Sequence, residues 1–165
     1  MRRIVIAAKE ELPIIQHIAT VAYHHTYVPI LGQDQVDYML NKIYSLNSLL
    51  EQLINGHRFI IVQEDELEAG FASYSRMEAD SEIYQLQKLY LLPELQGAGL
   101  GRFLIGEVIS QIKEQGARYL QLNVNRFNKS RGFYEKMGFT IKEKVDIPIG
   151  ERYYMNDYVM ELDIF

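Results

Sequence analysis

Residues 89–107, LYLLPELQGAGLGRFLIGE, place three glycines within five positions between two apolar runs. The run before Pro93 is typical of a strand. After the glycines, apolar side chains recur every three or four positions, which predicts an amphipathic helix over residues 100–115. A strand that enters a helix through glycines leaves unpaired amides at the positive end of the helix dipole. This stretch therefore predicts a phosphate site, with Arg102 as an added charged donor.

Two well-known phosphate motifs do not match this stretch. A dinucleotide fingerprint needs a glycine at its sixth position, and the sixth position counted from Gly97 is Arg102. A Walker A loop ends in Gly-Lys-Ser/Thr, whereas Gly101 is followed by Arg102 and Phe103. Either a purely structural turn or another kind of phosphate turn remains.

The remaining periodicity predicts one α/β domain over residues 1–165, with a mixed sheet and helices on its faces. No internal repeat or Pro/Gly-rich linker divides the chain. Pro29 and Gly32 separate the first two helices. The elements expected, in chain order, are a strand at 2–8, helices at 9–25, 34–44 and 49–56, strands at 58–63, 68–76 and 82–92, a helix at 100–115, a strand at 118–125, a helix at 129–137, and strands at 139–147 and 153–164.

Composition narrows the function classes. A net charge of −5 argues against a nucleic-acid partner, which normally needs a basic excess. The absence of cysteine excludes disulfides and thiolate zinc sites, and fits a cytoplasmic protein. Lys9, Glu10 and Glu11 rule out a signal-peptide core. No apolar run approaches the roughly 20 residues of a membrane span.

Two segments resemble the GNAT superfamily of N-acetyltransferases. LQKLYLLPELQGAGLGRFLI is similar to the acyl-CoA segment of that family, whose Gln/Arg-x-x-Gly-x-Gly/Ala pattern falls on Gln96, Gly99 and Gly101. NKSRGFYEKMGF, residues 128–139, resembles its second signature. The resemblance implies a mostly antiparallel central sheet flanked by helices, with two strands splayed at the acyl-CoA site. It also implies acetyl-CoA as acyl donor.

The resemblance assigns roles to individual residues. It implies that the strand at Leu89, Tyr90 and Leu91 pairs with the pantetheine arm, and that Asn128, or Asn125 as a substitute, contacts it. Each asparagine also suits a plain turn. The main-chain amides expected to hold the pyrophosphate of coenzyme A are those of Gln96, Gly97, Ala98, Gly99, Leu100, Gly101 and Arg102.

Tyr134 matches the tyrosine that the family places near the sulfur. A phenol with a pKa of about 10 is protonated at neutral pH and can give its proton to a leaving thiolate. The alternative is a core tyrosine packed beside Phe133 and Phe139.

The proton acceptor is open. Many relatives carry a glutamate on the strand before the glycines, but the matching positions here are Gln85 and Gln87. Glu82 is the only carboxylate of that strand and could act through water or be a solvated charge. The other candidates are Glu78, Asp80 and His25.

No metal is expected, because His24 and His25 are adjacent and point about 100° apart on a helix. The expected function is direct transfer of an acetyl group from acetyl-CoA to a primary amine of a small molecule or peptide, in a ternary complex. A non-catalytic acyl-CoA sensor and a general phosphate-binding domain are the alternatives. A homodimer is compatible with the sequence, which does not name the amine.

Overall fold

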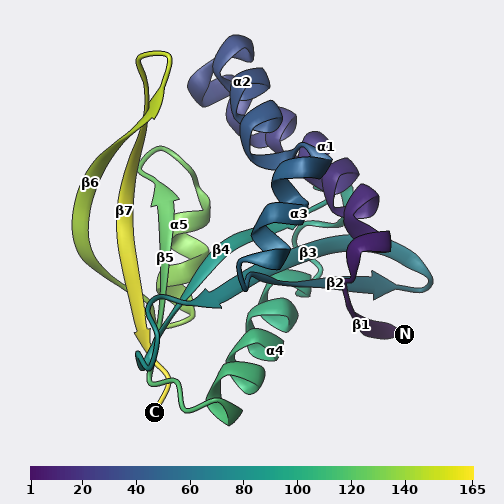
Figure 1. Cartoon of the computed structure of the whole chain (residues 1–165), viewed down its shortest axis with the longest axis vertical. Coiled ribbons are helices and arrows are strands. Elements are labelled where there is room, and N and C mark those ends of the chain that lie inside the picture. Colours follow the sequence, from purple (N-terminus) through teal and green to yellow (C-terminus); the bar gives the residue numbers. More distant parts are fainter. The chain divides into compact units, whose positions relative to one another are not determined.

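The computed structural model describes all residues, 1–165. The chain divides into two compact units, one made of Met1–Ser75 and Lys88–Val108, the other of Arg76–Gln87 and Ile109–Phe165. Seven strands and five helices are distributed over them (Figure 1). They are β1 Arg2–Ile6, α1 Leu12–Leu31, α2 Gln33–Tyr44, α3 Leu46–Ile54, β2 Arg58–Glu64, β3 Leu67–Arg76, β4 Ile83–Leu91, α4 Leu100–Glu114, β5 Tyr119–Asn125, α5 Ser130–Lys136, β6 Thr140–Gly150 and β7 Tyr153–Asp163, with short 3-10 turns η1 Lys9–Glu11 and η2 Pro93–Leu95.

Strand order confirms the mixed, mostly antiparallel sheet. It is β1-β2-β3-β4 in the first unit and β4-β5-β7-β6 in the second, because β4 contributes residues to both. The β4/β5 pair is parallel, over Ile83–Leu86 and Tyr119–Leu122. The pairs β1/β2, β2/β3, β5/β7 and β6/β7 are antiparallel. A parallel neighbour requires a crossover, which α4 supplies between β4 and β5.

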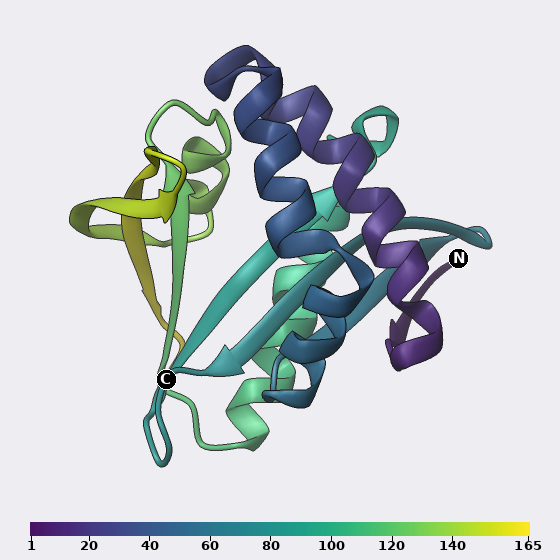
Figure 2. The ribbon, with the colours of Figure 1, turned by 45° about the horizontal axis from the view of Figure 1, so that its top comes forward.

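In the first unit, α1, α2 and α3 pack together over one face of the strands, and the first turns of α4 lie on the other (Figure 2). The buried stripe of α1 recurs at the helical spacing that the sequence shows, at Leu12, Ile15, Ile18, Ala19 and Ala22. Ser45 caps α3, its side chain accepting from the Ser48 amide at 3.2 Å.

The predicted end of the first helix at residue 25 is wrong. Helix α1 continues to Leu31 and contains Pro29. A proline removes one helical amide, but at this position the loss falls in the last turn, where few bonds remain to be made. Gly32, with a φ of 86°, then ends the helix and donates its amide to the carbonyl of Val28 at 2.9 Å.

The other predicted elements are confirmed to within a few residues. Asp65 and Glu66 form the two-residue turn of the β2/β3 hairpin, with φ values of 50° and 72°. In the second unit, β6 and β7 form a long hairpin and α5 packs on β5 (Figure 1).

The structure contains neither a membrane-spanning helix nor a metal-binding group of side chains. None of the helices combines the length and apolar character that crossing a membrane requires. The 165 residues contain no group of three or more histidine, aspartate or glutamate side chains that could hold a metal ion.

Candidate active site

The glycine turn joins β4 to α4 in the first unit. Gln96 is extended, and Gly97 and Gly99 have φ values of 86° and 81°, which only glycine adopts readily. Residues 96–99 are exposed. The amide of Phe103 donates to the carbonyl of Gly99 at 3.1 Å, so the amides of residues 100–102 precede the first helical bond and have no partner within α4. This is an anion-binding arrangement.

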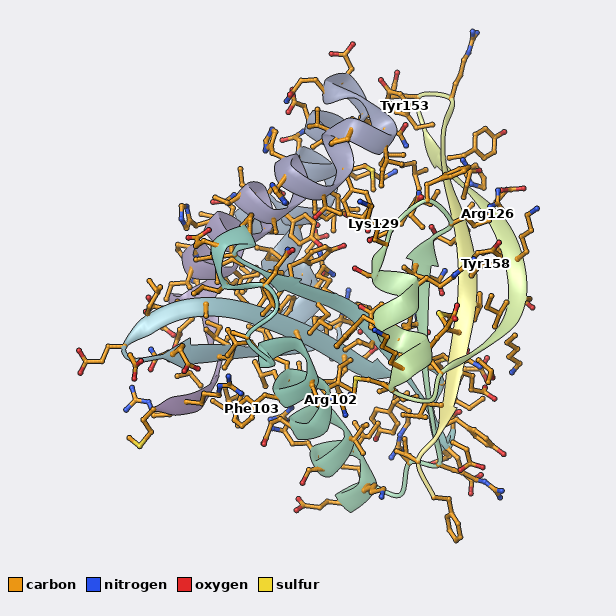
Figure 3. All side chains as sticks on the ribbon, turned by 180° about the vertical axis from the view of Figure 1, so that it is seen from behind. Arg102, Phe103, Arg126, Lys129, Tyr153 and Tyr158 are labelled. Atoms are coloured by element: carbon orange, nitrogen blue, oxygen red, sulfur yellow. The ribbon has the colours of Figure 1, made fainter.

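Arg2 holds this turn, a role that the sequence did not predict. Its guanidinium donates to the carbonyl of Ala98 and, through Nε, to Glu64 at 2.8 Å. It also lies over the ring of Phe103, 5.9 Å from the centroid. Arg102 and Phe103 occupy the first turns of α4 (Figure 3). The antiparallel pairing of Arg2 with Glu64 fixes the side chain beside the turn, and no local sequence signal reveals it.

The strand expected to meet the pantetheine arm, Leu89–Leu91, lies against Gly70 of β3. A Cβ atom at Gly70 would lie 2.6 Å from the carbonyl oxygen of Tyr90. The close approach of these strands therefore depends on the missing side chain.

Four tyrosines form a cluster in the first unit. The ring of Tyr23 lies 4.7 Å from that of Tyr27, 5.3 Å from Tyr44 and 5.2 Å from Tyr90, centroid to centroid. Burial raises the pKa of Tyr44 and of Tyr90 well above its ordinary value, so both phenols are neutral at physiological pH. The cluster joins α1 and α2 to β4.

Lys88 is a buried ammonium beside this cluster. Its Nζ lies 2.6 Å from Oε1 of Gln52 and 5.7 Å from the ring centroids of Tyr44 and Phe59. Burial lowers the pKa of Lys88 to about 8. Burial, and then the Lys88 charge, lowers the pKa of His57.

In the second unit, Tyr134 lies on α5 and is 8% exposed. Its ring is 5.3 Å from that of Phe133 and 5.7 Å from that of Phe139, both edge to face. The packing expected of a core tyrosine is thus present, and it also fixes the direction of the phenol.

Both candidate asparagines form the turn between β5 and α5. Oδ1 of Asn125 accepts from the amide of Phe127, and Oδ1 of Asn128 accepts from the amide of Ser130, each at 2.9 Å. The side-chain carbonyls therefore organise the backbone locally. A role toward the pantetheine arm stays a prediction.

The candidate proton acceptors are scattered. Glu82 is exposed and precedes β4, its carbonyl accepting from the amides of Arg118 and Tyr119 at 2.8 and 3.1 Å. Glu82 therefore lies beside the first residue of β5. Asn125 is at the other end of that strand, about 20 Å away at 3.3 Å per residue. Glu78, Asp80 and His25 are exposed.

Asp157 on β7 is a buried carboxylate that sequence reasoning missed. It is 2% exposed and pairs in register with Asn125. Burial raises the pKa of Asp157 to about 6, although a hydrogen bond from Asn123 and the charge of Arg126 lower it. The Asn156-Asp157 pair between the apolar stretches Tyr153–Met155 and Tyr158–Met160 of β7 is the signal that could have revealed it.

Comparisons with known proteins agree with this geometry. Residues 55–141 match the model of the acetyltransferase (GNAT) domain. The chain is 32% identical over 102 residues to a [ribosomal protein bS18]-alanine N-acetyltransferase of Haemophilus influenzae, a match that covers 60% of this chain and 64% of the relative. It is 30% identical over 134 residues to an uncharacterized N-acetyltransferase of Mycobacterium bovis, which covers 80% of this chain and 84% of the relative.

A solved structure shares the fold over its whole length. The PaiA N-acetyltransferase of Thermoplasma acidophilum, in complex with coenzyme A, superimposes with a TM-score of 0.84 at 22% identity, and the match covers 99% of both chains.

Proposed function

Because the chain belongs to the GNAT family and is an acetyl-CoA-dependent N-acetyltransferase, we propose that it transfers the acetyl group directly to a primary amine of a small molecule or peptide, within a ternary complex. The observation that carries the proposal is the exposed turn at residues 96–99, followed by the unbonded first amides of α4. The residues of the chain fit a pyrophosphate there.

Donor binding uses the main chain. The amides of residues 97–102 would hold the pyrophosphate, and the dipole of α4 and the charge of Arg102 would add to the attraction. The amide of Gln96 is not among them, because it donates to the carbonyl of Pro93 at 3.3 Å. Leu89, Tyr90 and Leu91 pair with the pantetheine arm, and Asn125 or Asn128 contacts it near the end of β5. Coenzyme A supplies the thioester, and the chain orients it.

The acetyl group moves in one displacement. The acceptor ammonium first loses a proton, and its nitrogen then attacks the thioester carbonyl carbon. The C–S bond breaks, and the phenol of Tyr134 protonates the departing thiolate. The attacking nitrogen loses its second proton to solvent as the amide forms, and solvent returns a proton to the Tyr134 phenolate. The sequence contains no cysteine, the side chain best suited to carry an acyl group between two half-reactions, which supports direct transfer.

A peptide amine is one acceptor class that the comparisons support, since the Haemophilus relative is named for an alanine of a ribosomal protein. The tyrosine cluster does not select among amines, because Tyr23, Tyr27 and Tyr44 are buried and pack on one another.

A non-catalytic acyl-CoA sensor is the second candidate. The observation that favours it is Gln85, which stands where many relatives carry a glutamate and which donates to Asn123 at 3.3 Å. An amide there cannot accept the proton of the amine.

Thiol release distinguishes the two functions. The purified chain is mixed with acetyl-CoA and a panel of polyamines, amino acids, peptides and aminoglycosides, and free coenzyme A thiol is measured. Release that depends on one amine supports the proposal. Tight coenzyme A binding without release on any amine supports the sensor instead.

A further inference from the structure

Asp157 lies on a polar face of the second unit's strands. In the β5/β7 register, Asn125 faces Asp157 and Gln121 faces Glu161. Nε2 of Gln121 donates to Oε2 of Glu161 at 2.6 Å, so the side chains of these paired positions share one face. Alternation along β5 puts Asn123 on this face too.

Helix α5 covers the opposite face. The guanidinium of Arg131 on α5 lies 5.4 Å from the ring centroid of Tyr158, the neighbour of Asp157 on β7 (Figure 3 labels Tyr158). Tyr158 pairs with Val124, whose side chain alternates with that of Asn123. Tyr134, on α5, and Asp157 therefore approach the strands from opposite faces.

A hydrogen-bonded chain leads from the missing glutamate to Asp157. Nε2 of Gln85 donates to Oδ1 of Asn123 at 3.3 Å, and the side chain of Asn123 bonds to the carboxylate of Asp157. The oxygen of the Asn123 amide thus accepts and its nitrogen donates, a consistent polarity that orients the carboxylate. The face that carries Gln85 in place of a glutamate thus has a carboxylate, that of Asp157, two strands further on.

The charges around Asp157 come from β5 and β6. Arg126, at the end of β5, acts on it electrostatically and also bonds to Asp146 of β6, with 2.6 Å between Nη2 and Oδ1. The residue of β6 directly opposite Asp157 is the apolar Val145. A second guanidinium nitrogen of Arg126, Nη1, is buried without a hydrogen-bond partner. Arg126 is shared between Asp157 and Asp146, so Asp157 has no cation of its own.

We propose that Asp157 is the general base of the reaction and receives the proton that the acceptor ammonium loses before attack. The inference rests on the proposed N-acetyl transfer. In this step the N–H bond of R–NH3+ breaks, the proton joins a carboxylate oxygen of Asp157, and R–NH2 is left to attack the thioester; Asp157 later returns the proton to solvent. Asn123 is a positioning residue.

Burial prepares Asp157 for this step. The pKa of Asp157, raised to about 6, keeps most of the carboxylate ionised at pH 7 and makes it more basic than an exposed aspartate. A base with a pKa close to the working pH is the most effective kind. Glu82, exposed at the other end of β5, lacks such surroundings.

The test compares the pH profile of amine acetylation in wild type, Asp157→Asn and Asp163→Asn. Asp163 is an exposed aspartate on the same strand and serves as the matched control. We expect Asp157→Asn to lower kcat by about 10²-fold or more at pH 7, with unchanged coenzyme A binding. Its rate should then rise about tenfold per pH unit up to the pKa of the amine, since only the neutral amine can react. Asp163→Asn should match wild type.

Asn123→Ala gives a second, independent reading, because it leaves the carboxylate in place. The hydrogen bond from Asn123 lowers the pKa of Asp157, so its loss should move the acidic limb of the wild-type profile, expected near pH 6, to higher pH. A structural role would not move that limb.

Normal rates and an unchanged limb in Asp157→Asn would overturn the inference, as would loss of activity in Glu82→Gln with Asp157→Asn unaffected. These results leave the proposed function intact. A wild-type chain that binds coenzyme A and acetylates no amine would instead overturn both.

Discussion

The guanidinium of Arg2 donates a hydrogen bond to the carbonyl of Ala98, 96 residues further along the chain. Glu64 holds the same guanidinium from β2, with 2.8 Å between Nε and Oε2. The carbonyl of Ala98 is thereby fixed between two glycines of positive φ, the residues that would otherwise give the turn most freedom. The first strand thus orders the candidate pyrophosphate site before a ligand arrives.

Loss of this bond should weaken coenzyme A binding. Arg2→Ala is expected to raise the Kd about fivefold, roughly 1 kcal/mol, which is below the usual range of about 1.5–3 kcal/mol for a charged hydrogen bond because the side chain is partly exposed. Arg3→Ala is the control, since Arg3 bonds to Gln63 on the same pair of strands. Titration calorimetry with coenzyme A measures both, and equal affinities would show that the turn needs no support from β1.

Gly99→Val should weaken coenzyme A binding more than it disturbs the fold. A β-branched residue at a φ of 81° is strained by about 1–3 kcal/mol, and its side chain would occupy the phosphate side of the turn. The only atoms within 4 Å of a Cβ atom there belong to the Arg2 guanidinium, at 3.6 Å and beyond. Gly106→Ala, in the middle of α4 with open space around it, is the control. Thermal unfolding with and without coenzyme A separates the effects: a full ligand-induced shift in Gly99→Val would mean that the turn is structural only.

Local patterns account for most of the fold. The periods of two and of 3.6 residues located every strand and helix, and the glycine spacing located the turn, because each of these features depends on neighbours within a few residues. The predicted end of α1 was wrong for the same reason, since Pro29 and Gly32 looked like a break, whereas the helix continues six residues beyond residue 25, through Pro29 to Leu31. Tyr134 and the two asparagines came from motifs whose positions are local.

Residues brought in by strand pairing could not be predicted. Arg2 reaches the turn through β1/β2 pairing, and Asp157 meets Asn125 through β5/β7 pairing. The residues that flank Arg2 and Asp157 in the sequence do not indicate the register of either strand pair. The buried Lys88 was missed similarly, because β4 reads as a plain strand until Gln52 of α3 and the rings of Tyr44 and Phe59 surround it.

The free energy of unfolding should rise between pH 8 and pH 10 as the buried Lys88 loses its charge. Its pKa is about 8 in the folded chain and 10.5 without burial, so the unfolded chain binds more protons in this range and the free energy of unfolding rises with pH. This rise with pH should be about 2 kcal/mol larger in wild type than in Lys88→Met, which has no amine to titrate at this position. Urea unfolding at several pH values measures it. Parallel pH dependences in the two proteins would contradict the role given to burial at Lys88.

Tyr134→Phe should remove turnover and leave acetyl-CoA binding intact. The substitution keeps the ring contacts with Phe133 and Phe139 and deletes only the hydroxyl. We expect kcat to fall about 10²-fold or more with little change in KM, the pattern of an interaction made only in the transition state. Tyr158→Phe, which deletes a hydroxyl on β7 and keeps the ring beside Arg131, is the control. Near-normal kcat in Tyr134→Phe would leave Tyr134 a core residue.

Transfer of an isotopically labelled acetyl group from acetyl-CoA tests the central claim most directly. The wild-type chain is incubated with labelled acetyl-CoA, with and without the amine that gives thiol release, and label is located by mass spectrometry. Direct transfer predicts label on the amine nitrogen in the complete mixture and none on the protein when the amine is omitted. Label that accumulates on the protein and then passes to the amine, or no labelled amine despite bound acetyl-CoA, would contradict the account.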